Sequence, residues 1–135
     1  MKNVLATIIG LIVASITVHI FEAVIGHNLF TFPEGADLSD VKWIKNNMGK
    51  IPMGSKVFVV IAHFAGIITG MFTAAKISKQ SVIPSYITGG LMVIATFVTI
   101  VILPKELWFS ISDGVLAITG FLIGKLIAQK QITNF

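Results

Sequence analysis

Residues 57–76 read VFVVIAHFAGIITGMFTAAK, an apolar run that contains a single titratable side chain, His63, before it ends at Lys76. A helix needs roughly 20 mainly apolar residues to cross the hydrocarbon core of a bilayer, which is about 30 Å thick. The run therefore predicts a membrane-spanning helix. Three similar runs predict further spans at residues 3–25, 82–103 and 107–125.

The composition agrees with a chain that is surrounded largely by lipid. Of its 135 residues, 55% are hydrophobic and only 12% are charged, and the mean hydropathy is +0.92. Soluble domains of this size are much less apolar. The four predicted spans use most of the chain, so we expect one transmembrane domain, residues 1–135, without a separate soluble module.

The connections between the spans predict how the helices are arranged. Residues 78–81 and 104–106 are too short to join parallel helices, which indicates an all-α, antiparallel four-helix bundle. The only sizeable loop, residues 26–53, contains apolar residues at helical spacing, which predicts an amphipathic interfacial helix over about 37–48. Asp37 or Ser39 is the expected N-cap. This segment either straps two spans together or forms a lid over the bundle.

Lysines alone account for the net charge of +4, since the chain has no arginine. With four spans the two termini share one side of the membrane, and the lysines on that side, which have no acidic neighbours, lie close to the ends of the spans, which favours the cytoplasm. They are Lys2, Lys76, Lys79, Lys125 and Lys130. We expect no nucleic-acid partner. The absence of cysteine excludes disulfide exchange and thiolate metal sites.

Small residues recur at every fourth position in three of the predicted spans. Such stripes allow helix backbones to approach closely in lipid. The glycines expected to mediate helix packing are Gly10, Gly66, Gly70, Gly120 and Gly124. In the first span the small stripe lies roughly opposite the face that carries Ser15, His19 and Glu22, so one face is free for a second protomer and a homo-oligomer is expected.

A polar cluster is predicted near one membrane surface. His19 and Glu22 share a helical face in the first span, and His63 and Asp113 fall at a similar depth in the second and fourth spans. Charged groups within a bilayer are costly and usually pair inside the bundle. The natural partners of Glu22 are therefore His19 and His63, with threonines Thr96 and Thr99 of the third span nearby.

This cluster is compatible with several kinds of site. A His–Glu pair is suited to carrying protons, two histidines and two carboxylates suit a divalent metal such as zinc, and the same groups suit a lipid headgroup or a small solute. Each role requires that the side chains converge.

Structural roles are the alternative for each of these residues. Glu22 reaches the interface beside His27 and Lys56, Asp113 caps the fourth helix, and His63 is a single imidazole satisfied by a neighbouring helix. No phosphate-binding loop, nucleophile elbow or HExxH motif is present, so an enzyme is not expected.

Two segments, residues 63–78 (HFAGIITGMFTAAKIS) and 104–113 (PKELWFSISD), resemble an uncharacterised family of small four-span bacterial membrane proteins. The resemblance covers nearly the whole chain and brings no assigned function. Small multidrug-resistance exporters also have four spans and an acid in the first span, but Glu22 lies near the end of its span and not in the middle. The chain also lacks the arginine-rich pattern of glutathione- and eicosanoid-type membrane enzymes.

From the sequence we predict a proton-linked small-solute transporter or channel-like protein of the bacterial inner membrane, with both termini in the cytoplasm. The expected partners are lipids, a second copy of the chain, and a proton or small solute. We assign no catalytic residue, metal ligand or cofactor. The alternatives are an accessory membrane subunit without its own site, and a lipid-headgroup-binding or metal-dependent membrane protein.

Overall fold

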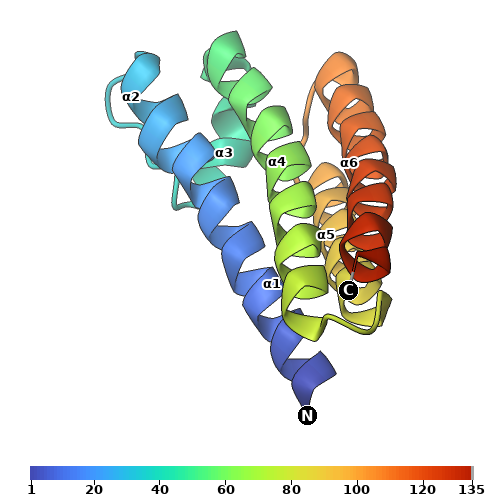
Figure 1. The fold of residues 1–135 in the computed structure, drawn as a ribbon. Coiled ribbons are helices and arrows are strands. Elements are labelled where there is room, and N and C mark those ends of the chain that lie inside the picture. The colour runs from blue at the N-terminus through green and yellow to red at the C-terminus, as the bar shows by residue number, and fades with distance from the viewer. Residues whose placement is uncertain (135) are drawn as a thin grey trace.

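The computed structural model describes residues 1–134, and the predicted all-α fold is confirmed. Four long helices are joined by short turns and by one longer loop that carries a short helix (Figure 1). The elements are α1 (Lys2–His19), a π-helical segment η1 (Ile20–Gly26), α2 (His27–Leu29), α3 (Val41–Asn47), a 3₁₀ turn η2 (Met48–Lys50), α4 (Met53–Ser78), α5 (Ile83–Ile102) and α6 (Leu107–Thr133).

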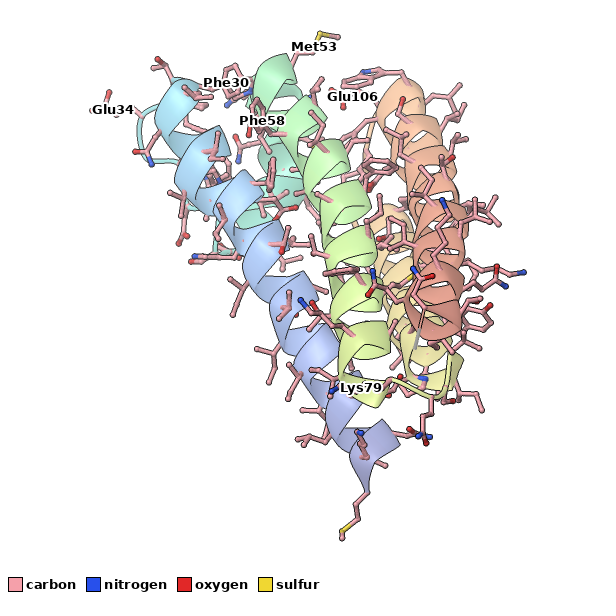
Figure 2. All side chains as sticks on the ribbon, in the orientation of Figure 1. Phe30, Glu34, Met53, Phe58, Lys79 and Glu106 are labelled. Carbon is pink, nitrogen blue, oxygen red and sulfur yellow. The ribbon has the colours of Figure 1, made fainter. Side chains whose placement is uncertain are left out.

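Helix α4 is the centre of the bundle, because it packs more extensively than any other helix against the remaining three long helices, α1, α5 and α6. Both termini and the α4–α5 turn lie at one end of the molecule, and α2, the long loop and the α5–α6 connection lie at the other (Figure 1). Figure 2 marks the two ends by Lys79 on one side and by Met53 and Glu106 on the other. In the view of Figure 1, α1 leans away from α5 and α6 toward the end that carries the long loop.

Within residues 1–134, four helices are long and apolar enough to cross a membrane: Lys2–Leu29, Met53–Ser78, Ile83–Ile102 and Leu107–Thr133. The second begins at Met53 where the sequence predicted residue 57, and the last continues to Thr133 where it predicted residue 125. Large apolar side chains cover the outside of the bundle, as a lipid environment requires. They include Ile12, Ile94, Val101, Val115 and Leu122.

The small-residue stripes form the interfaces within the bundle. A Cβ added at Gly70 would lie 2.7 Å from Ala14 Cβ and 2.8 Å from the Gly10 carbonyl oxygen, so the backbones of α1 and α4 are in direct contact. A Cβ at Gly124 would meet Met71 of α4. The stripes are therefore used inside one protomer, and the homo-oligomer stays a prediction.

The π-helical segment η1 keeps α1 aligned with α4 over its full length. In an α-helix, residues four apart advance by roughly 40° beyond a full turn, so the stripe of Ala6, Gly10 and Ala14 would rotate away from α4 before Gly26. A π-helical turn holds more residues than an α-helical turn, and η1 therefore takes up this rotation. As a result Gly26 again faces Phe58 of α4, and Glu22 points toward the bundle.

The interfacial helix is shorter than predicted and begins later. Asp40, and neither Asp37 nor Ser39, is its N-cap, because the Asp40 carboxylate accepts a hydrogen bond of 2.8 Å from the Lys42 backbone N–H. Asp37 instead accepts hydrogen bonds from the backbone and side chain of Ser39 in the preceding turn. The segment continues through Met48, which packs with Val60 and Phe109 in a small apolar core. These apolar contacts hold the segment against α4 and α6.

Candidate functional site

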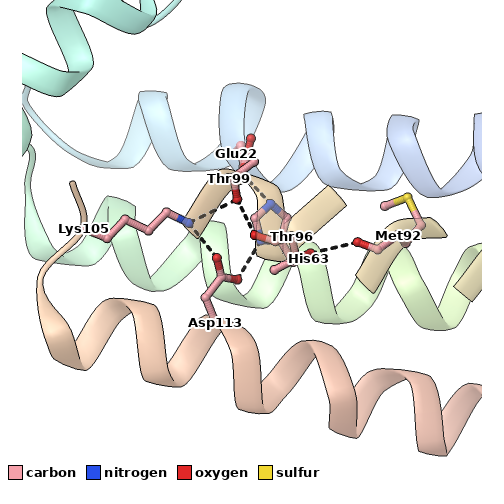
Figure 3. Close-up of polar contacts among 7 residues, drawn as sticks. All are labelled: Glu22, His63, Met92, Thr96, Thr99, Lys105 and Asp113. Carbon is pink, nitrogen blue, oxygen red and sulfur yellow. Dashed lines mark hydrogen bonds and ion pairs between the residues drawn. The ribbon is translucent and has the colours of Figure 1, made fainter. Parts of the chain in front are cut away.

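His63 lies between two carboxylates that come from different helices (Figure 3). Its Nδ1 is 2.6 Å from Asp113 Oδ1 on α6, and its Nε2 is 3.5 Å from Glu22 Oε1 on η1. Three elements that are far apart in sequence therefore contribute to one row of titratable groups. The side chain of Asp113 is completely buried, whereas that of Glu22 is 32% exposed.

Lys105 completes the row on the far side of Asp113. Its Nζ lies 2.7 Å from Asp113 Oδ2, donates a hydrogen bond of 3.4 Å to Thr99 Oγ1, and sits 4.5 Å from the centre of the Phe109 ring. Only 2% of the side chain is exposed. Asp113 thus accepts hydrogen bonds from a histidine and from a buried ammonium group, which compensates for the cost of burying its charge.

The sequence pattern gave Lys105 no role in the cluster. It lies in the short α5–α6 connection, outside the four predicted spans. In the structure its long side chain extends from the connection into the bundle and reaches Asp113 (Figure 3). The sequence feature that could have indicated this contact is the spacing of eight residues between Lys105 and Asp113, which places both residues near the start of α6.

Among the other predicted residues, the structure leaves His19 outside the cluster. His19 is exposed, and its side chain makes no hydrogen bond or ion pair with any of residues 1–134. Asp113 lies inside α6 and does not cap it, since the N-cap position belongs to Glu106. Thr99 joins the cluster through Lys105, while Thr96 bonds back to the Met92 carbonyl oxygen.

A cavity of about 620 Å³ opens beside the cluster. Its polar lining includes Glu22, His63, Lys105 and Thr99, and the α3 segment supplies part of its apolar wall. The remaining lining residues are His19, Ala23, His27, Phe32, Leu38, Ser39, Ile44, Met48, Ile51, Ser55, Lys56, Val59, Leu103 and Phe109. The α3 segment therefore forms part of the wall of this cavity, and its role as a lid stays a prediction.

A separate ion pair, outside the row of Glu22, His63, Asp113 and Lys105, lies near the cavity at the loop-bearing end of the bundle. Lys56 of α4 donates a hydrogen bond to Glu106, which precedes α6, and the Lys56 side chain is only 5% exposed. This hydrogen bond holds the pKa of Glu106 below its ordinary value of 4.5. The pair ties the start of α4 to the start of α6.

Toward the end that carries the termini, the bundle is filled. One helical turn beyond His63, the fully buried Ile67 packs with Met71 and Ala117. The lining residues of the cavity all belong to the other half of the molecule. The cavity is thus a pocket beside the row formed by Glu22, His63, Asp113 and Lys105, the polar row, and it does not continue through the core of the bundle.

Within residues 1–134, no group of three or more His, Cys, Asp or Glu side chains is arranged to hold a metal ion. The two ring nitrogens of His63 point to different carboxylates, and the carboxylates are on opposite sides of the ring. The side chains therefore form a row of pairs, where a zinc site needs ligands that converge on one point.

The fold and this row of buried charges define the chain as a small helical membrane protein with an internal polar network. No protein-family model, curated protein or solved structure matches the chain.

Proposed function

We propose that the protein is a small proton-linked solute transporter or channel-like protein of the inner membrane, in which Glu22 and His63 exchange protons with the cavity. The observation that carries the proposal is the position of His63 between two carboxylates, one buried and one open to the cavity.

The geometry around His63 couples its protonation to that of Glu22. A doubly protonated imidazole donates from both nitrogens, whereas a neutral one has a single N–H and one lone pair. A lone pair that faces a carboxylate oxygen is repelled unless the carboxyl group carries a proton. Two protonation states are therefore compatible with this geometry: neutral His63 with protonated Glu22, and charged His63 with ionised Glu22. They differ by the transfer of one proton between the two side chains.

Asp113 and Lys105 keep this exchange on the cavity side. Asp113 is completely buried and is already bonded to Lys105, so its charge is compensated without His63. Protons therefore move between His63, Glu22 and the cavity, while the Asp113–Lys105 pair fixes the orientation of the imidazole ring.

The proposal is tested by proton movement in proteoliposomes that contain a pH-sensitive dye. Flux is measured with a potassium diffusion potential, with and without a mixture of small amines, carboxylates and sugars. We expect Glu22→Gln to lower the flux at least about tenfold, because the amide cannot accept a proton. Glu34→Gln, in the exposed loop, is the matched control and keeps the wild-type flux.

An accessory subunit without its own site gives a different result. Its vesicles show no proton movement above protein-free vesicles under either condition, or show the same flux for Glu22→Gln as for the wild type. Either result contradicts the proposed function.

A further inference from the structure

The charges around the cavity do not cancel when its histidines are neutral. The carboxylates are Glu22, Glu106 and Asp113, and the ammonium groups are Lys56 and Lys105. Three negative charges minus two positive charges leave one negative charge. Since Lys56 pairs with Glu106 and Lys105 pairs with Asp113, the remaining charge belongs to Glu22.

Glu22 is also the most accessible of the charged side chains that line the cavity. It is 32% exposed, compared with 5% for Lys56 and 2% for Lys105. An anionic ligand would have to break a buried ion pair to find a positive partner, which is costly. A cationic ligand meets a carboxylate whose nearest partner, His63 Nε2, is 3.5 Å away.

The rest of the cavity is suited to an apolar group attached to that cation. Its wall contains aromatic and aliphatic side chains from the loop, from α3 and from α6, including Phe32, Leu38, Ile44 and Phe109. A volume of about 620 Å³ lies in the range of small-molecule pockets, which typically combine apolar walls with a few polar groups.

We propose that this cavity binds an amphipathic organic cation, whose charged amine pairs with Glu22 and displaces the proton held between Glu22 and His63. The inference rests on the proposed function and names the class of its substrate. The proton-loaded state is the one in which His63 is charged and Glu22 is ionised. When the amine binds, His63 loses its Nε2 proton to solvent, and the ammonium group donates hydrogen bonds both to Glu22 and to the freed Nε2 lone pair, so one cation replaces one proton.

The other titratable groups around Glu22 do not take over this role. Asp113 and Lys105 compensate each other in a buried ion pair, and Asp113 does not line the cavity. His19 and His27 line the cavity wall but are exposed and form no ion pair within residues 1–134. His63 is therefore the group that exchanges its proton for the ligand.

The test is calorimetric titration of the protein in lipid nanodiscs made of phosphatidylglycerol, which carries no amine. The ligand is 2-phenylethylammonium, and 3-phenylpropionate serves as its anionic counterpart. We expect the amine to bind the wild-type protein at least about tenfold more tightly than the carboxylate does. This comparison needs no variant and so does not depend on the folding of a mutant.

Proton release is obtained from titrations in two buffers that differ in ionisation enthalpy. We expect close to one proton released per amine bound, because the proton on His63 Nε2 leaves when the amine pairs with Glu22. His63→Gln should keep amine binding but lose this proton release. Glu22→Gln should bind the amine at least about tenfold more weakly, with Glu34→Gln unchanged as the control.

Addition of phosphatidylethanolamine to the nanodiscs identifies the source of the cation. A lower apparent affinity for the free amine supports an aminolipid headgroup as the occupant, and an unchanged affinity supports a free amine. Equal binding of 3-phenylpropionate, or equal binding of the amine to Glu22→Gln, overturns the inference. Because proton flux is measured separately, a flux that depends on Glu22 without amine binding leaves the proposed function standing.

Discussion

At the scale of single residues, Asp113 is the side chain on which the polar row depends. It is completely buried and is the only acid bonded to both His63 and Lys105 among the described residues. Removing its charge would leave the buried ammonium group of Lys105 without a counter-ion. The row is therefore part of the folded core as well as a candidate site.

Asp113→Asn should lower the free energy of unfolding by about 3 kcal/mol, because it leaves a buried charge without its partner. The double variant Asp113→Leu with Lys105→Met should lose less, since it removes both charges. Thermal unfolding in detergent, followed by circular dichroism, measures the difference. An Asp113→Asn protein as stable as the wild type would show that Lys105 has no need of this carboxylate.

The ion pair of Lys56 with Glu106 predicts a pH dependence at the loop-bearing end. The pKa of Glu106 is lowered in the folded state from 4.5 by the hydrogen bond from Lys56. A depressed folded pKa contributes stability above the unfolded pKa, and that contribution is lost as the pH falls below about 4.5 through the folded value. Glu106→Gln should remove this part of the acid sensitivity. If the variant and the wild type lose the same stability between about pH 5 and pH 3, other carboxylates are responsible.

At the scale of helices, the contact between α1 and α4 places Glu22 beside His63. The glycines of both helices allow the backbones to meet, and the π-helical segment keeps Glu22 and Gly26 on the side that faces α4. π-Helical turns are rare and occur often at functional sites. Here the turn explains why Glu22 reaches the cluster while His19, just before the turn, does not.

Gly70→Leu should separate α1 from α4, because even a Cβ at this position lies 2.7 Å from Ala14 Cβ. Overpacking of this kind costs at least about 2 kcal/mol. Gly90→Leu is the matched control in α5, where an added Cβ has no heavy atom within 4 Å. Thermal unfolding of both variants in detergent measures the effect, and equal unfolding temperatures would contradict a backbone contact at Gly70.

At the scale of the whole molecule, the two ends of the bundle differ in character. One end carries the termini and the α4–α5 turn, and its lysines have no acidic neighbours in sequence. The other carries the long loop, the cavity and the pair of Lys56 with Glu106. Under the positive-inside rule we expect the first end in the cytoplasm and the cavity open toward the outside.

The orientation is testable because the chain has no cysteine. Glu34→Cys, in the long loop, should react with a membrane-impermeant maleimide added to intact cells. Gln80→Cys, in the α4–α5 turn, should react only after the membrane is permeabilised. The opposite labelling pattern would place the termini outside and the cavity in the cytoplasm.

Much of the architecture follows directly from the sequence. Apolar runs such as residues 57–76 determine the spanning helices, because every backbone polar group in lipid must be satisfied within its own helix. Short connections determine the antiparallel order. The positions of Glu22, His63 and Asp113 along their helices also follow, since depth is set by residue number and by the rise of a helix.

The tertiary structure alone decided which side chains meet. Glu22 reaches His63 through a π-helical turn that no pattern of apolar residues indicated, and Lys105 enters the core by extending from a connection. His19 shares a predicted face with Glu22 but is left outside the cluster. The physical reason is that sequence periodicity fixes the depth and the average face of a side chain, whereas contact depends on helix rotation, on crossing and on the reach of long side chains.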